Sequence, residues 1–188
     1  MSATQQFIEA LIMLKTADLS LLRRCSGLSL HRAGPEFDLF TGLWWPIRQT
    51  NRRTPARWSA WLVAKLYGSC PLRLGSRRLA ALLGAVEPPV TQRRGKPDTR
   101  DRDRFRGRFD ILLMSPALDL AIEPHLKWCF REVRARGPND PAIDWVALLD
   151  DLWKWDRGNG GVQREWTEQY LNHDREAHHE QSDDIEDD

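Results

Sequence analysis

The segment from Arg93 to Arg108 carries the densest set of charges that could do chemistry in this chain. It holds eight basic and three acidic residues among 16, a net charge of +5. On a helix, arginines four residues apart lie about 6 Å from each other on one face. Such a row can follow a phosphate backbone, because each cation that meets a phosphate releases counterions. The segment is therefore a candidate polyanion-binding element.

The spacing of the basic residues predicts two rows on neighbouring helices. One row lies on a helix expected from Arg100 to Met114 and contains Arg100, Arg104 and Arg108. The other lies on a helix expected from Pro124 to Arg136 and contains Lys127, Arg131 and Arg134. Both rows could instead be solvated faces that pair with the nearby acids Asp101, Asp103 and Glu132. The residues alone leave these two interpretations open.

Catalytic interpretations find little support. The chain contains no G-x-x-x-x-G-K-[ST], G-x-G-x-x-G or H-E-x-x-H pattern. His173-Asp174 is a dipeptide of metal-dependent phosphohydrolases, but it has no partner histidines earlier in a helical core. Asp150 and Asp151 diverge by about 100° on a helix, so we expect them to be solvated rather than to share a cation. The sequence favours a binding protein with no catalytic residues, no metal and no cofactor.

The net charge of +1 conceals an asymmetry along the chain. Residues Asn172 to Asp188 include eight acids and one arginine, a net charge of −7, so the preceding residues carry +8. A basic body favours a polyanionic partner. Residues 172–188 have no apolar face and are predicted to form an acidic, disordered tail.

The pattern of apolar residues predicts an all-α fold of two small helical bundles. No segment shows the period-2 alternation of a strand. The stretch EPPVTQRRGKPDT, from Glu87 to Thr99, combines prolines, a glycine and charges, as linkers do. We therefore expect an N-terminal bundle over residues 1–87, a linker over 88–99 and a C-terminal bundle over 100–171.

Local signals predict where two of the N-terminal helices end or begin. A short helix that starts with Phe37 and Phe40 is expected to stop near Pro46, because proline breaks helix hydrogen bonding. Ser76 is expected to cap the helix that contains Leu79 and Leu83.

Ala142 to Leu171 is expected to form an antiparallel helical hairpin. Asp144 is a suitable N-cap for the first helix, and Gly158-Asn159-Gly160-Gly161 allows the reversal that follows it. The second helix would pack through Trp166 and Tyr170. The apolar stripe of the first helix consists of Trp145, Leu148, Leu149, Leu152 and Trp155.

The same segment resembles a known family. The run DWVALLDDLWKWD, a short turn and VQREWTEQYL resemble the C-terminal signature of the CasB family, the small subunit of the type I-E CRISPR surveillance complex, Cascade. A weaker resemblance covers Leu22-Arg23-Arg24, Trp58 to Leu66 and Leu72 to Leu82. The segment DILLMSP and the acidic tail depart from the family's pattern.

This resemblance implies a non-catalytic subunit that binds nucleic-acid backbone and stabilises the R-loop and the displaced non-target strand in antiviral defence. It implies as partners the backbone and large subunits of Cascade, a second copy of the chain, guide RNA and target DNA. Because R-loop formation is close to energetic balance, a few backbone contacts can tip it. The candidate nucleic-acid-binding residues are Arg23, Arg24, Arg52, Arg53, Arg100, Arg104, Arg106, Arg108, Lys127 and Arg131.

Two other classes of protein remain open. A free-standing helical DNA-binding regulator would prefer a particular duplex sequence, and a metal-dependent phosphohydrolase would depend on His173 and Asp174. The three cysteines, Cys25, Cys70 and Cys129, are odd in number and far apart, which indicates reduced thiols in a cytoplasmic protein. No signal peptide or membrane span is expected.

Overall fold

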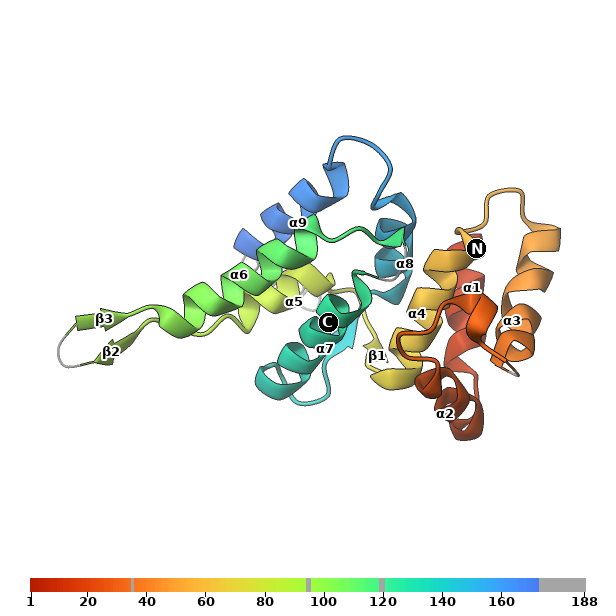
Figure 1. Cartoon of the computed structure of the whole chain (residues 1–188), viewed down its shortest axis with the longest axis horizontal. Helices are drawn as coiled ribbons and strands as arrows, with labels where there is room; N and C mark the ends of the chain where they lie inside the picture. The colour runs from red at the N-terminus through yellow and green to blue at the C-terminus, as the bar shows by residue number, and fades with distance from the viewer. Residues whose placement is uncertain (35, 94–95, 119–120, 173–188) are drawn as a thin grey trace, which may run out of the picture.

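The computed structural model describes residues 1–34, 36–93, 96–118 and 121–172, and within them the fold is all-α, as predicted. Its helices form a body from which one end of a long helix and a β-hairpin project as an arm (Figure 1). The helices are α1 (Ala3–Ile12), α2 (Thr16–Arg24), η1 (Leu30–Arg32), α3 (Glu36–Thr50), α4 (Arg57–Ser69), α5 (Leu79–Ala85), α6 (Arg100–Met114), α7 (Glu123–Arg136), α8 (Trp145–Lys154) and α9 (Gly161–Leu171).

Two small sheets join segments that the sequence pattern did not reveal. Strand β1 (Arg73–Leu74) pairs in parallel with β4 (Ala142–Ile143), and β2 (Thr91–Arg93) pairs antiparallel with β3 (Lys96–Asp98). Each strand has only two or three residues. A strand that short cannot show a period-2 pattern, which explains why periodicity did not predict it.

Helix α2 lies against α4, which is deeply buried. The residues of α4 from Ser59 to Gly68 are all buried. Gly68 permits the close approach, because a Cβ atom there would lie 2.8 Å from the Cβ of Leu22 and 3.0 Å from the carbonyl oxygen of Leu19. A larger residue would force the two helices apart.

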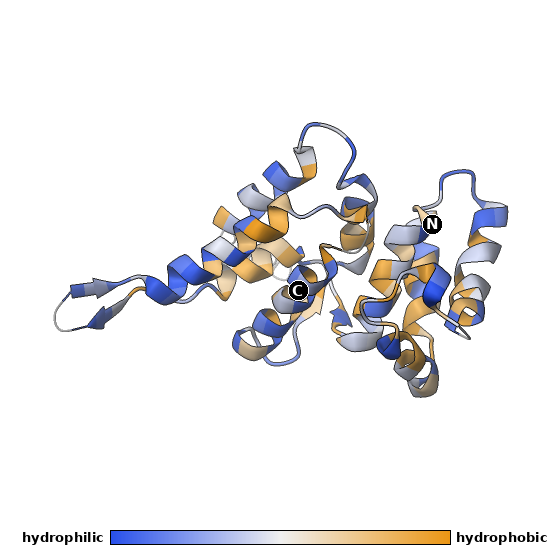
Figure 2. Ribbon diagram, viewed as in Figure 1, coloured by the Kyte–Doolittle hydropathy of each residue, from blue (hydrophilic) through white to orange (hydrophobic). Residues whose placement is uncertain are grey.

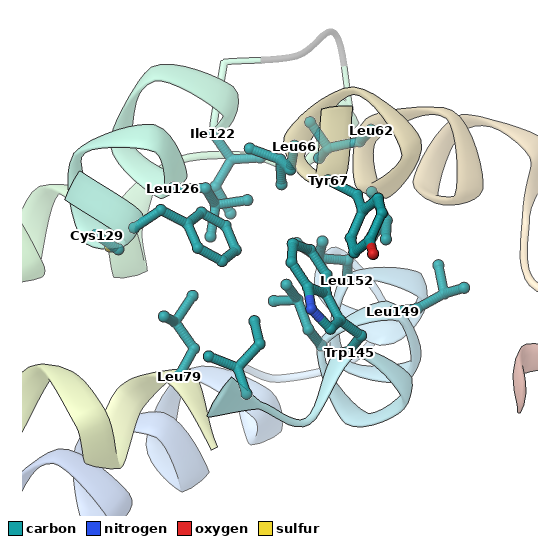
Figure 3. Packing of buried hydrophobic residues seen from close by; sticks show 14 of the residues in the cluster. Leu62, Leu66, Tyr67, Leu79, Ile122, Leu126, Cys129, Trp145, Leu149 and Leu152 are labelled. Atoms are coloured by element: carbon teal, nitrogen blue, oxygen red, sulfur yellow. The ribbon is translucent and has the colours of Figure 1, made fainter. Parts of the chain in front are cut away.

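Helix α8 forms as its apolar stripe predicted. All five stripe residues are buried, and the side chain of Asp144 accepts a hydrogen bond of 2.8 Å from the backbone N–H of Ala147. Trp145 lies in the core, where its indole contacts Tyr67 (Figure 3). It also stacks on the ring of Phe130. Its N–H donates to the carbonyl of Leu72 at 2.9 Å, so the buried polar atom is satisfied.

The reversal after α8 also forms as predicted, but α9 does not pack along α8. Gly158 and Gly160 have positive φ angles of 92° and 71°, which glycine adopts at little cost. The two helices meet through the Trp155 and Trp166 rings, 5.0 Å apart, whereas α9 packs mainly along α5. The expectation of an antiparallel hairpin in which the two helices pack together was wrong, because α8 packs on α1 and α4 instead.

Two predicted helix ends were also wrong. Helix α3 continues through Pro46 to Thr50, because Phe40 and Ile47 on either side of the proline are buried in the core. Helix α5 begins at Leu79, with Arg78 rather than Ser76 as its N-cap. The preceding residues are held extended by β1–β4 pairing and by a hydrogen bond of 2.9 Å from the N–H of Asp144 to the carbonyl of Arg77.

The hydrophobic core runs through both halves of the chain. Buried residues from α1 to α9 belong to one cluster. Helix α5, which was assigned to the N-terminal bundle, packs mainly on α9 and also on α7. The expected linker, residues 88–99, contains the β2–β3 hairpin. The division into two bundles stays a prediction, and a boundary at residue 87 separates α5 from its principal neighbour.

Asp151 is buried, contrary to the expectation that it is solvated. Its carboxylate accepts a hydrogen bond of 2.8 Å from the indole N–H of Trp166, and Arg78 lies 3.4 Å away. Asp150, next to it, accepts a hydrogen bond of 2.6 Å from Thr4. Burial raises the pKa of Asp151 to about 6, even though the Trp166 and Arg78 contacts act in the opposite direction. Asp151 is thus a pH-sensitive part of the core.

We expect this carboxyl to make the fold less stable as the pH rises from about 4 to about 6. In that window the folded chain keeps a proton that the unfolded chain has released, so the free energy of unfolding falls with pH and then levels off. Asp151→Asn keeps an acceptor for Trp166 and should remove this fall, raising stability at pH 7 by up to about 3 kcal/mol. Urea unfolding at pH 5 and pH 7 measures the difference. The exposed Asp110→Asn variant is the control, and an unchanged pH dependence in Asp151→Asn would contradict the prediction.

Candidate nucleic-acid interface

The arm of the molecule carries the basic segment that the sequence singled out. It consists of β2, β3 and the first turns of α6, and it is strongly hydrophilic (Figure 2). The buried residues of α6 are Phe105, Phe109 and Leu112, all beyond its first turn. At the start of the helix Thr99 donates to the carboxylate of Asp103 at 2.6 Å. The helix therefore extends past the core and presents its N-terminal arginines to solvent.

Arg104 and Arg108 from α6 line a groove between α6 and α7. The groove has a volume of about 370 Å³. The rings of Phe105 and Trp128 meet edge to face with their centroids 5.0 Å apart. The guanidinium of Arg108 lies 5.8 Å from the Trp128 ring centroid. The groove thus holds its cations over buried aromatic rings, and its arginines suit a phosphate backbone.

Arg136 supplies the third cation of this groove and was not among the predicted residues. Its guanidinium lies 6.0 Å from the Phe105 ring centroid and 3.1 Å from the carboxylate of Glu132. Trp128, Glu132 and Arg136 are four residues apart on α7 and therefore share a face. That four-residue spacing was the signal in the sequence that could have pointed to Arg136. Only the packing of α6 on this face of α7, however, makes Arg136 part of the groove.

Asp101 holds Arg104 of the groove only weakly. Arg104 and Asp101 lie 3.9 Å apart, and their side chains are 80% and 78% exposed. Such an exposed pair contributes at most about 1 kcal/mol. A phosphate group can therefore take the place of the carboxylate at small cost. The lining includes Arg104, Arg108 and Arg136 against Asp101 and Glu132, so the groove keeps a positive charge.

Arg100 lies apart from this groove, at the base of the hairpin. Together with Arg93 and Lys96 it lines an open hollow of about 580 Å³. Its side chain is 72% exposed and lies 3.9 Å from Asp98. The arm therefore has two basic surfaces, one on the hairpin and one on the groove.

Arg106 is turned away from both basic surfaces of the arm. It donates to the two carboxylate oxygens of Glu87 at 3.0 and 3.1 Å, and the hydroxyl of Tyr170 donates to the same carboxylate. Burial opposes ionisation of Glu87, but the hydrogen bonds from Arg106 and Tyr170 outweigh it and lower the pKa of this carboxyl. The carboxylate of Glu87 thereby links Arg106 of α6 to Tyr170 of α9.

The row on α7 also faces away from the groove. Lys127 is only 28% exposed and lies 2.6 Å from Glu123, and it also donates to Ser26. Arg131 is exposed and lines, with Lys127 and Arg134, a separate hollow of about 290 Å³ beside the end of α4. The two predicted rows are therefore separate surfaces, because Arg104 and Arg108 of α6 line the groove, whereas the α7 row lines a different hollow.

The predicted arginines of the N-terminal half are also distributed over separate places. Arg23 donates from Nε to the carbonyl of Gly68 at 3.1 Å, and Arg24 lies 3.5 Å from Glu36 with its side chain 68% exposed. Arg52 and Arg53 are exposed on the loop between α3 and α4. Arg48 orders that loop by donating to the carbonyl of Arg52 at 3.4 Å and to Thr54 at 3.2 Å.

Among the described residues, no group of three or more His, Cys, Asp or Glu side chains is placed to hold a metal ion. His173 and Asp174, on which the phosphohydrolase alternative depends, lie outside the described residues, as does most of the acidic tail. In the ranges that the structure describes, no helix combines the length and the apolar character that crossing a membrane requires.

Fold and surface together define an all-helical protein with a basic, aromatic-walled groove and a projecting basic arm. A family model described as CRISPR-associated protein Cse2 matches residues 18–171. The chain therefore belongs to the Cse2 (CasB) family of CRISPR-associated Cascade subunits, as the resemblance implied.

Solved structures of the family share this fold. The chain is similar to M. ruber CasB with 21% identity and a TM-score of 0.65, covering 94% of this chain and 97% of that one. It is similar to CasB from Thermus thermophilus with 24% identity and a TM-score of 0.64, covering 91% and 99%. A further Thermus thermophilus structure, of a CRISPR-associated protein of the Cse2 family, gives 24% identity and a TM-score of 0.62, again covering 91% and 99%. No curated protein sequence matched the chain.

Proposed function

We propose that this chain is a non-catalytic small subunit of a type I-E Cascade ribonucleoprotein that holds nucleic-acid backbone and so stabilises the R-loop and the displaced non-target strand. The observation that carries the proposal is the groove between α6 and α7, with Arg104, Arg108 and Arg136 around an aromatic wall. Its partners would be the backbone and large subunits, a second copy of the chain, guide RNA and target DNA.

Little sequence specificity is required for such a role. Guide pairing supplies the specificity, and an R-loop is near energetic balance, so a few phosphate contacts shift it toward the open form. Exposed arginines meet phosphates of any sequence. The solvent-exposed Arg100, Arg52, Arg53 and Arg131 would add contacts along the path of the nucleic acid.

The proposal is tested by co-purification with the other Cascade subunits and guide RNA. We expect the wild-type chain to enter a stoichiometric complex and to slow the closure of an R-loop formed on matched target DNA. A chain that stays out of the complex would contradict the proposal. Binding of the isolated chain to one duplex sequence in preference to others would instead indicate a free-standing regulator.

A further inference from the structure

A cup in the N-terminal half of the molecule has no role in the function proposed above. It has a volume of about 420 Å³ and lies between η1, the first turn of α4 and the segment that follows α6. Its floor is the buried Trp61, whose indole N–H donates to the carbonyl of Leu28 at 3.0 Å. Its walls and rim are formed by Leu30, His31, Phe37, Arg57, Trp58 and Leu118.

Two apolar side chains at this cup are unusually exposed for their type. Phe37 is 39% exposed and Leu118 is 50% exposed, although both are apolar. Cups of this size that combine aromatic walls with a few polar groups are typical of sites for small, flat ligands. A volume of about 420 Å³ admits one ring system but not a helix.

The charges at the cup favour a ligand attached to a phosphate. Arg57 is exposed at the rim, and no described residue forms an ion pair with it. None of the described lining residues is acidic. Arg57 is also the first residue of α4, directly after the ordered loop that presents Arg52 and Arg53. Three cations therefore lie within six residues of the chain, and the last of them is at the rim of the cup.

We propose that this cup binds one unstacked base of a single-stranded nucleic acid, with the neighbouring phosphates on Arg57 and the Arg52–Arg53 loop. The inference rests on the proposed function and adds a site to it. Stacking on Trp58 and Phe37 would tolerate any base, because every base has a π-face. A displaced strand offers unpaired bases, whereas a duplex does not, so the site would favour the open R-loop.

The test compares binding of the full chain to two single-stranded oligonucleotides of equal length, one with bases and one abasic throughout. We expect the wild type to prefer the base-bearing strand by about 5- to 100-fold. The double variant Trp58→Leu/Phe37→Leu should lose most of this preference while its salt dependence stays the same. Arg57→Gln should keep the preference and lower the salt slope by about 0.7.

Trp45→Leu is the matched control, since Trp45 is 51% exposed on α3 and does not line the cup. Equal wild-type affinity for the two strands would overturn the base site and leave the proposed function standing. Absence of any binding by the wild type would overturn both. If the double variant keeps its preference but no longer enters the ribonucleoprotein, the cup receives a protein side chain and the inference is wrong.

Discussion

Glu123→Ala is expected to lower the free energy of unfolding by about 3 to 5 kcal/mol. Glu123 and Lys65 form an ion pair whose side chains are 2% and 0% exposed. Burial lowers the pKa of Lys65, and the hydrogen bond and charge of Glu123 act against that shift. Removing the carboxylate would leave a buried ammonium with no counter-ion, which is among the most destabilising changes possible in a core.

The same pair connects segments that are distant in the sequence. Glu123 on α7 accepts a hydrogen bond of 2.8 Å from the backbone N–H of Gly27, and Lys65 on α4 donates to the carbonyl of Leu28 at 3.0 Å. The loop after α2 is thereby fixed to both helices. Loss of Glu123 would release this loop as well as the charge, so the unfolding should also become less cooperative.

Urea unfolding followed by circular dichroism measures this effect. Glu132→Ala is the matched control, because Glu132 lies on the same helix and pairs with Arg136 near the surface, so its loss should cost at most about 1 kcal/mol. The double variant Lys65→Met/Glu123→Leu should recover most of the stability, since it removes both buried charges. A loss below about 1 kcal/mol for Glu123→Ala would show that water or another group compensates Lys65.

The second large effect concerns nucleic-acid binding. The triple variant Arg104→Ala/Arg108→Ala/Arg136→Ala should weaken binding to random-sequence single-stranded DNA by about 3- to 100-fold, because each exposed pair with a phosphate contributes up to about 1 kcal/mol. The slope of log K against log salt should fall by about 2.1, as three phosphate contacts to a single strand are lost. Within Cascade, the variant should assemble and hold its target less tightly.

Fluorescence anisotropy at several salt concentrations measures both quantities. The control is Arg73→Ala/Arg157→Ala/Arg164→Ala, which changes the net charge equally at exposed positions outside the groove. If the control loses as much affinity, overall charge rather than the groove governs binding. Lys127 is left intact in this test, because its bond to Glu123 would mix a stability effect with a binding effect.

The sequence by itself predicted the local features of this protein, such as the start of a helix, its buried face and the reversal that follows it. The apolar stripe from Trp145 to Trp155 predicted α8 and its buried face, and Asp144 predicted its start. Gly158 and Gly160 marked the reversal that follows. The basic residues of α6 and α7 were placed on the correct helices. These features depend on residues within a few positions of one another, so a short stretch of chain suffices to specify them.

The tertiary structure alone decided which surfaces these elements make. Periodicity defines a face relative to the axis of its own helix, but the rotation of that helix is set by distant neighbours. Thus Lys127 donates to Ser26 in the loop after α2, Arg106 turns toward Glu87, and Arg136 joins Arg104 and Arg108 in one groove. Asp151 becomes buried for the same reason, since Trp166 on another helix covers it and donates a hydrogen bond to its carboxylate.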